Sequence, residues 1–263
     1  MSEWGGISAL ALKRRLSRGD YIIQLRDVMV GGEEGPKIVG VIYGPSQAQQ
    51  AVEEGADIIE FRVDLAEDVD GVLRDLEKVS LPIILTNRRV EEGGNATINR
   101  RDQLGPLLSY ASIVDIELMA PDRDDLMAEA ATQGRPTLLS YHDLDGTPAE
   151  TAMLEIMRTA NHYGDIVKLA VTIEHLQDAP RVLDVSLAAQ EEGLTFSVVP
   201  MGPLGSHIRP LMGIYGSSLL YGYVGRQISP KMRPYGFTGK RASPGMLSVS
   251  QLKRALIEIR SWQ

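Results

Sequence analysis

Residues 164–172, Gly-Asp-Ile-Val-Lys-Leu-Ala-Val-Thr, form a short apolar run with one lysine at its centre. The aliphatic side chains on both sides of Lys168 predict a buried strand. Burying an ammonium group costs several kcal/mol unless its charge is paired or lost. The stretch therefore predicts one strand of the core and raises the question of what Lys168 does inside it.

Seven more apolar runs of this kind occur along the chain. The eight runs begin 20 to 30 residues apart, and helical patterns with clear start and stop signals lie between them at 45–57, 147–165 and 179–193. Alternation of strands and helices with short connections is typical of a parallel sheet. Eight repeats in this length favour an α/β fold of the (β/α)8 TIM barrel type over an open doubly wound sheet. The runs are Lys37–Tyr43, Asp57–Val63, Pro82–Thr86, Ser112–Leu118, Pro136–Tyr141, Asp165–Val171, Thr195–Pro200 and Ser218–Val224.

The segment before the first run predicts a β-hairpin that closes the bottom of the barrel. It spans 21–39 and carries turn signals at Gly31-Gly32 and Gly35-Pro36. We expect residues 1–19 to be an N-terminal extension and residues 20–263 to form a single barrel domain. A dinucleotide-binding fold has little support, because no Gly-x-Gly-x-x-Gly follows the first strand.

Composition excludes several classes of function. The 263 residues carry a net charge of -8, which argues against nucleic acid as a partner. The chain has no cysteine, which rules out disulfides, thiolate nucleophiles and zinc held by cysteine. It has no apolar run of membrane-spanning length, and the basic residues near its start follow the apolar run there instead of preceding it. We therefore expect a cytoplasmic protein without a membrane partner.

Charged side chains are predicted to point into the barrel. In Glu-Phe-Arg-Val-Asp-Leu, residues 60–65, charged and apolar residues alternate. Neighbouring strand residues face opposite sides, so the apolar set meets the helices and the charged set faces inward. These inward charges gather at the C-terminal rim, where the active sites of such barrels lie, although an internal ion-pair network would also explain them. The same alternation, applied to the other strands, predicts further inward polar residues, and Arg88 and Glu92 follow the third strand at the same rim. The predicted rim residues are Glu60, Arg62, Asp64, Arg88, Glu92, Asp115, Glu117, Ser140, His142 and Lys168.

An inward lysine has two interpretations. It can stay protonated as the ion-pair partner of Glu60 or Asp64, or burial and nearby arginines can favour its neutral amine. A neutral amine attacks a ketone and forms a Schiff base. The Schiff base makes the neighbouring C–H group more acidic, so that a histidine can remove its proton. His142 is the favoured histidine because it lies one strand before Lys168 at the same rim. His207 is a weaker candidate for this role.

At these residues the chain resembles the type I 3-dehydroquinate dehydratases, which are Schiff-base enzymes of the shikimate pathway. The similar pieces run in the family's order from about residue 21 to the C-terminus. They are Glu-Phe-Arg-Val-Asp, the Arg88–Glu92 pair, Val-Asp-Ile-Glu-Leu, Ser-Tyr-His-Asp, Asp-Ile-Val-Lys-Leu-Ala and Met-Gly-Pro-Leu-Gly-Ser-His-Ile-Arg.

The resemblance implies a role for each matching residue. Lys168 would form the imine, His142 would transfer protons and Glu92 would orient His142. The resemblance also implies a carbon–oxygen lyase that converts 3-dehydroquinate to 3-dehydroshikimate, without a metal or organic cofactor, in a possible homodimer. The substrate-binding residues it implies are Glu60, Arg62 and Arg88 for the ring hydroxyls, Arg209 for the carboxylate, Met201 and Tyr215 for the ring, and Ala242 and Met246 in the loop that covers the substrate.

That covering loop departs from the family pattern Ser-Ala-Pro-Gly-Gln. Two partial matches exist, at residues 228–232 and at 242–246. We favour the second, which leaves about 227–241 as a remodelled loop and puts Met246 in place of the glutamine. Loss of polar groups from the loop would weaken substrate binding by about 1–3 kcal/mol. The alternatives to a dehydroquinate dehydratase are a Schiff-base lyase for a different cyclic polyol keto acid and a non-catalytic or metal-dependent relative.

Overall fold

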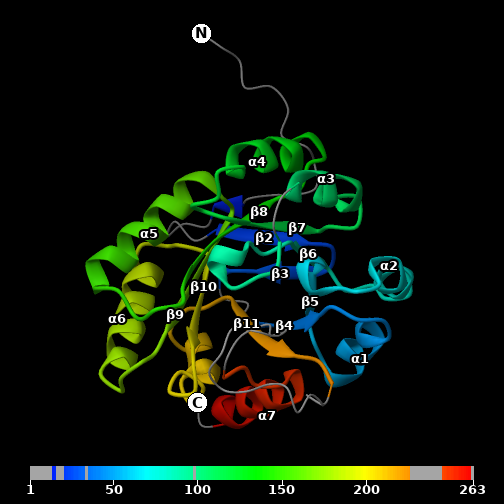
Figure 1. The fold of residues 1–263 in the computed structure, drawn as a ribbon. Helices are drawn as coiled ribbons and strands as arrows, with labels where there is room; N and C mark the ends of the chain where they lie inside the picture. The colour runs from blue at the N-terminus through cyan, green and yellow to red at the C-terminus, as the bar shows by residue number, and fades with distance from the viewer. Residues whose placement is uncertain (1–13, 16–20, 33–34, 97–98, 226–244, 262–263) are drawn as a thin grey trace.

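The computed structural model describes residues 14–15, 21–32, 35–96, 99–225 and 245–261. Eight parallel strands form its central sheet, in the order β10-β9-β8-β7-β6-β5-β4-β11. Each lies within a residue or two of a predicted run, which confirms the TIM barrel (Figure 1). The strands are β4 (Lys37–Ile42), β5 (Ile58–Arg62), β6 (Ile83–Thr86), β7 (Ile113–Glu117), β8 (Thr137–Asp143), β9 (Ile166–Thr172), β10 (Phe196–Met201) and β11 (Leu219–Tyr223).

The two ends of this strand order, β10 and β11, meet to close the barrel. The backbone N–H of Ser218 donates to Phe196 O at 2.7 Å. The Ser197 hydroxyl donates to Leu219 O at 2.7 Å, and the Ser217 hydroxyl accepts from the N–H of Val198 at 3.0 Å. Side-chain hydroxyls thus add to the backbone hydrogen bond at this seam.

Helices surround the strands (Figure 1) and divide the apolar residues into two layers. The outer layer, between strands and helices, contains Phe61, Val167 and Leu169. The inner layer contains Ile166 and Ala170, the neighbours of Lys168 on the same face, so the predicted alternation of faces is confirmed. The helices are α1 (Gln47–Glu54), α2 (Val69–Leu76), α3 (Arg100–Leu104), α4 (Arg123–Thr132), α5 (Glu150–Tyr163), α6 (Asp178–Glu191) and α7 (Val249–Arg260), with 3₁₀ turns η2 (Val63–Leu65), η3 (Val90–Glu92), η4 (Gly105–Leu107) and η5 (Arg209–Gly213).

A small antiparallel sheet packs into the N-terminal end of the barrel, as predicted. It consists of β1 (Arg14–Arg15), β2 (Tyr21–Leu25) and β3 (Val28–Val30). Ile23, Leu25 and Val30 are buried in the inner layer. The predicted turn position is wrong, because the hairpin reverses at Arg26, whose φ is 51°. The Arg26 guanidinium donates to the carbonyls of Ser80 and Leu81, which supports this left-handed backbone.

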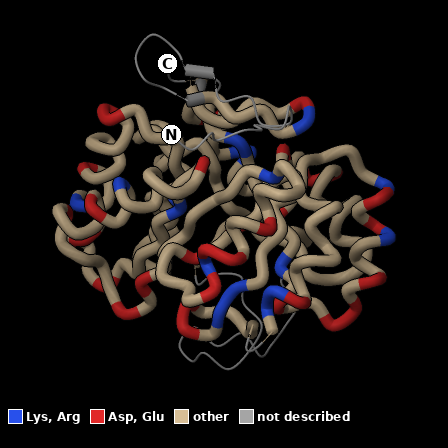
Figure 2. Tube along the Cα trace, turned by 90° about the horizontal axis from the view of Figure 1, so that it is seen from above, with Lys and Arg blue, Asp and Glu red and all other residues tan. Residues whose placement is uncertain are grey.

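Acidic and basic residues are interspersed around the periphery of the trace (Figure 2). No helix of the described part of the chain is both long and apolar enough to cross a membrane. The predicted remodelled loop at 227–241, the alternative loop register at 228–232, Ala242 and most of the predicted extension at 1–19 lie outside the described residues. Arg14–Arg15, within that extension, pairs with β2.

Candidate active site

Lys168 lies inside the barrel on β9, with only 7% of its side chain exposed. Its Nζ is 3.1 Å from Glu60 Oε1 on β5 and 3.3 Å from Asp115 Oδ2 on β7. The ring of Tyr221, on β11, lies 4.1 Å from the same nitrogen. The structure therefore surrounds Lys168 with charge partners from strands more than 50 residues away in sequence, as the inward alternation predicted for Glu60.

Arg88 links Lys168 to a larger network of buried charges. Its guanidinium contacts Asp115 Oδ2 at 2.5 Å, Glu117 Oε1 at 3.0 Å and the Ser140 hydroxyl at 2.6 Å. Burial opposes the charge on Asp115, but Arg88 and Lys168 hold the pKa of this carboxyl well below its usual range. Burial likewise opposes the charge on Arg88, whose pKa the carboxylates nevertheless raise.

Arg100 extends this network and was not predicted. It is buried, pairs with Glu117 and donates to Asn87 O at 3.1 Å. Its other partner is Asp122, at 2.9 Å. Arg100 thereby fixes the carboxylate that supports Arg88. The contact joins a helix to the end of the next strand, and no periodicity in the sequence predicts it.

His142 lies near the end of β8 and is oriented by Glu92. Its ring Nδ1 is 2.9 Å from Glu92 Oε2, and its backbone N–H donates to the same oxygen at 3.0 Å. Burial and the cations Arg88 and Lys168 hold the pKa of His142 well below its usual value, so the imidazole is neutral at pH 7. A neutral imidazole held at Nδ1 leaves Nε2 as a base.

Glu92 itself has a perturbed carboxyl group. Burial raises its pKa to about 7, with the nearby carboxylates of Glu117 and Asp115 adding to the shift and Arg88 opposing it. The predicted pairing of Glu92 with His142 is thus present in the structure. The pair combines a neutral imidazole with a carboxyl group that changes its charge near neutral pH.

Glu60 and Arg62 also occupy the predicted inward positions. Glu60 is buried and accepts from the Thr86 hydroxyl at 3.1 Å. Arg62 forms a bidentate pair with Asp64, at 2.8 and 2.7 Å. Burial opposes the charge on Asp64, but Arg62 and two backbone N–H groups hold its pKa below the usual range.

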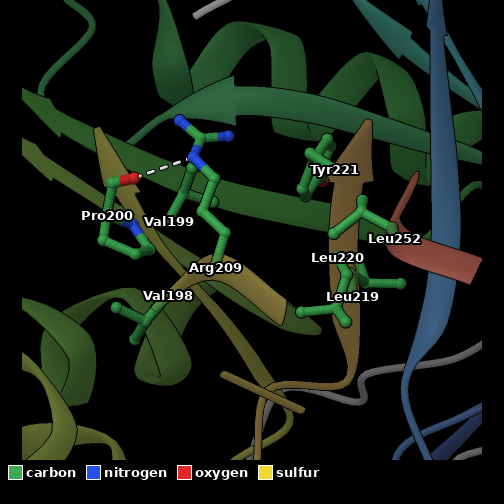
Figure 3. A pocket seen from close by; sticks show the side chains of 8 residues that line it. All are labelled: Val198, Val199, Pro200, Arg209, Leu219, Leu220, Tyr221 and Leu252. Carbon is green, nitrogen blue, oxygen red and sulfur yellow. Dashed lines mark hydrogen bonds between the residues drawn. The ribbon is translucent and has the colours of Figure 1, made fainter. Parts of the chain in front are cut away.

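The remaining residues at the C-terminal rim of the barrel, which we call its mouth, come from the last third of the barrel. Figure 3 shows Arg209 extending from η5 toward the end of β10, where its Nε donates to Pro200 O at 2.8 Å. Arg209 is buried, which lowers the pKa of its guanidinium to about 10. Met201 is buried in the inner layer, and Met246 packs against that layer. Met246, the last residue of the 242–246 register, therefore lies beside the inner layer, while the 228–232 register lies outside the described residues.

Tyr215 does not lie with these residues, so its predicted place beside the substrate is wrong. It precedes β11 and therefore lies at the N-terminal end of that strand, where Gly213 packs against Pro36 and Gly216 against Gln190. The aromatic side chain that does reach Lys168 is Tyr221. The alternation of faces along the predicted run 218–224 could have identified it.

These residues include the groups that carbonyl chemistry requires. Lys168 supplies an amine in a buried, charged surrounding, and His142 supplies a neutral base on the neighbouring strand. Burial removes competing water and strengthens the electrostatic interactions of any charge that develops. The arrangement suits imine formation with a ketone followed by proton transfer at the adjacent carbon.

Comparison with known proteins gives a consistent family match. Residues 44–261 match the model of a family described as type I 3-dehydroquinase. The 3-dehydroquinate dehydratase of Methanothrix thermoacetophila is 39% identical over 228 residues, covering 84% of this chain and 91% of that protein. The 3-dehydroquinate dehydratase of Halobacterium salinarum is 34% identical and covers 82% and 94%. The crystal structure of the 3-dehydroquinate dehydratase from Geobacillus kaustophilus shares the fold, with a TM-score of 0.78 at 24% identity, over 92% of this chain and 97% of that one.

Proposed function

Because this chain belongs to the type I 3-dehydroquinase family, its reaction is the dehydration of 3-dehydroquinate by a hydro-lyase, and we propose that the reaction proceeds through an imine on Lys168. The observation that carries this proposal is the buried position of Lys168 Nζ inside the barrel, between Glu60 and Asp115. The two carboxylates compensate the buried charge of Lys168, and His142 on the neighbouring strand supplies the base that imine chemistry needs.

The proposed steps balance without any oxidant or cofactor. The neutral amine of Lys168 adds to the C3 ketone. The ketone oxygen then leaves as water with one proton from the amine and one from solvent, and the nitrogen keeps the other amine proton as a protonated imine. His142 removes a proton from C2, and the electron pair forms an enamine. The enamine expels the C1 hydroxyl, which leaves as water with the proton from His142. A second water then hydrolyses the imine and releases 3-dehydroshikimate.

The other predicted residues serve binding and orientation in this proposal. Arg209 binds the carboxylate, Glu60 and Arg62 hold ring hydroxyls, and Met201 packs against the ring. Arg88 has both terminal nitrogens engaged by Asp115, Glu117 and Ser140, which favours a role in holding the charges around Lys168 over direct contact with the substrate. Glu92 orients His142 through Nδ1.

Trapping with borohydride tests the imine. The protein is incubated with 3-dehydroquinate and borohydride, and intact mass is measured, while enone absorbance is followed in parallel without borohydride. We expect an adduct and enone formation in the parent protein, and neither in Lys168→Ala. Lys78→Ala is the matched control, because Lys78 is an exposed surface lysine paired with Asp75. A folded parent protein that gives no adduct would refute the proposal.

A second candidate function rests on Met246. This side chain packs against the inner layer at the mouth, where the family loop resembling 242–246 ends in glutamine. A ring acid with an apolar group in place of a hydroxyl would suit Met246 better than 3-dehydroquinate does. We expect Met246→Gln to lower KM for 3-dehydroquinate about tenfold if Met246 contacts the substrate. A parent protein that forms the adduct but no enone would favour this second function.

The cytoplasmic location and the homodimer are further parts of the proposal. The net charge of -8 supports the location, and the family resemblance supports the homodimer. Size-exclusion chromatography with light scattering tests the dimer, for which we expect about twice the mass of one chain, 28.8 kDa. A monomeric mass at micromolar concentration would exclude it.

A further inference from the structure

The ring of Tyr221 is a contact of Lys168 that the reaction steps above do not use. Tyr221 lies in the middle of β11, with its side chain in the inner layer and 5% of the residue exposed. Figure 3 shows it on the strand beside Arg209. Lys168 Nζ lies 4.1 Å from the ring centroid, well within the roughly 6 Å range of a cation–π contact.

Charged groups face Lys168 from several neighbouring strands. Glu60 on β5 and Asp115 on β7 favour a positive nitrogen. His142 on β8 is neutral, and Arg88, after β6, shares Asp115 with Lys168 and opposes the positive charge. Among these partners the Tyr221 ring is the one from β11, across the β10–β11 seam from the strand order that leads to Lys168 on β9.

The Tyr221 ring interacts with the nitrogen in a different way from the carboxylates. A carboxylate needs an N–H hydrogen, and an ammonium group has three of them. A protonated imine keeps only one N–H, so Glu60 and Asp115 cannot both remain hydrogen-bonded to it. A ring face attracts the positive charge itself and needs no hydrogen from the nitrogen.

We propose that Tyr221 is a positioning residue whose ring holds the Lys168 nitrogen as a cation, first as ammonium and then as protonated imine. The inference rests on the imine proposed above and adds a residue to it. Burial, with Glu60 and Asp115, keeps the pKa of the Tyr221 hydroxyl well above its usual value, so the ring stays a neutral phenol throughout the working pH range.

Two changes follow when the ring face is removed. The ammonium loses its proton at a lower pH. The acid limb, which is the rise of imine formation with pH as the neutral amine appears, therefore moves to lower pH. The protonated imine also loses its proton at a lower pH, which moves the alkaline limb in the same direction. A buried cation–π contact corresponds to a shift of about one pH unit in both limbs. Simple damage to the fold would lower the amount of adduct without moving either limb.

The test compares Tyr221→Leu, which removes the ring, with Tyr221→Phe, which removes only the hydroxyl. The adduct formed with 3-dehydroquinate and cyanoborohydride is quantified by intact mass across a pH series. We expect both limbs of the Tyr221→Leu profile to lie about one pH unit below those of the parent protein. The Tyr221→Phe profile should overlay the parent's.

Two results would overturn the inference: a Tyr221→Leu profile with unmoved limbs, or a Tyr221→Phe profile that shifts as far as the leucine profile. Tyr221→Met replaces the leucine variant if that variant does not fold. Reductive methylation of Lys168 by formaldehyde and cyanoborohydride, mapped on peptides, gives the acid limb without any substrate. If the parent protein forms no adduct with 3-dehydroquinate, the proposed function fails, while the methylation profile still tests the contact of Tyr221 with the ammonium.

Discussion

Replacing Asp115 with asparagine tests whether the buried charges support the barrel as well as the chemistry. Asp115 is fully buried and contacts Arg88 at 2.5 Å and Lys168 at 3.3 Å, and it accepts from the Ser140 hydroxyl at 2.6 Å. Asparagine keeps the shape and an acceptor for Ser140 but removes the charge. Both cations then lose a counter-ion in a place that water does not reach.

The expected loss in the free energy of unfolding is about 3 kcal/mol. Removing one partner of a buried ion pair costs about 3–5 kcal/mol. The lower end applies because each cation keeps another carboxylate, Glu60 at 3.1 Å for Lys168 and Glu117 at 3.0 Å for Arg88. Asp57→Asn is the control, because Asp57 accepts a backbone N–H from Ile38 at 2.8 Å, a contact that asparagine can keep. We expect that control to lose about 1 kcal/mol or less.

Urea unfolding followed by circular dichroism measures both variants. The native pKa of Asp115 lies below its ordinary value of 3.8, so its contribution is complete above that pH and is lost as the pH falls through the native pKa. The gap between parent and Asp115→Asn should therefore be constant from pH 5 to pH 8. A loss no larger than that of Asp57→Asn would refute the view that these cations depend on Asp115.

Three further predictions concern the base, its partner and the hairpin. His142→Gln should still form the borohydride adduct but lose turnover by about a hundredfold to ten-thousandfold, measured by enone absorbance, and an unchanged rate would exclude His142 as the base. Glu92→Gln should gain up to about 3 kcal/mol in the free energy of unfolding relative to the parent between pH 4.5 and pH 8. The reason is that the parent loses stability as the pH rises through the Glu92 pKa of about 7. A stability difference between the two proteins that stays constant with pH in urea unfolding would contradict that pKa. Ile23→Ala should cost about 2–5 kcal/mol in the same assay, and a loss below about 0.5 kcal/mol would mean that the hairpin is not part of the cooperative core.

The strands and their inward faces were predictable because they depend on local pattern. A two-residue alternation fixes which side of β5 and β9 faces the helices, so the inner positions of Glu60 and Lys168 followed directly. The helix ends were also local, since Gly55 ends α1 with a positive φ of 87°. The hairpin turn was missed because Arg26 takes a left-handed backbone through contacts with residues 54 and 55 positions away.

The contacts within the site were not predictable from local pattern. Arg88 and Ser140 are 52 residues apart, and Arg100 on α3 meets Glu117 at the end of β7 only through tertiary packing. Tyr221 was missed for a different reason, since an aromatic residue in an apolar strand is more often ordinary core. The alternation of faces along β11 points the Tyr221 side chain inward, and its 4.1 Å contact with Lys168 follows once β11 and β9 are placed in the same barrel.

The same burial produces opposite protonation states on neighbouring strands, and the nearest charges decide which. Asp115 remains ionised because Arg88 and Lys168 outweigh its burial. Those two cations keep His142 neutral. Glu92 lies near the carboxylates of Glu117 and Asp115 as well as Arg88, and its pKa rises to about 7. Near neutral pH the group that changes charge is therefore Glu92 and not the imidazole.

Turnover should consequently follow the ionisation of Glu92. An ionised Glu92 accepts from His142 Nδ1–H more strongly and makes Nε2 a better base, so the rate should rise with pH around 7. In Glu92→Gln this limb should vanish, because glutamine does not titrate, and the remaining rate should be lower and flat between pH 6 and 8. A limb that persists at the same pH in Glu92→Gln would assign it to another group, and the charge on Glu92 would then have no part in setting the base.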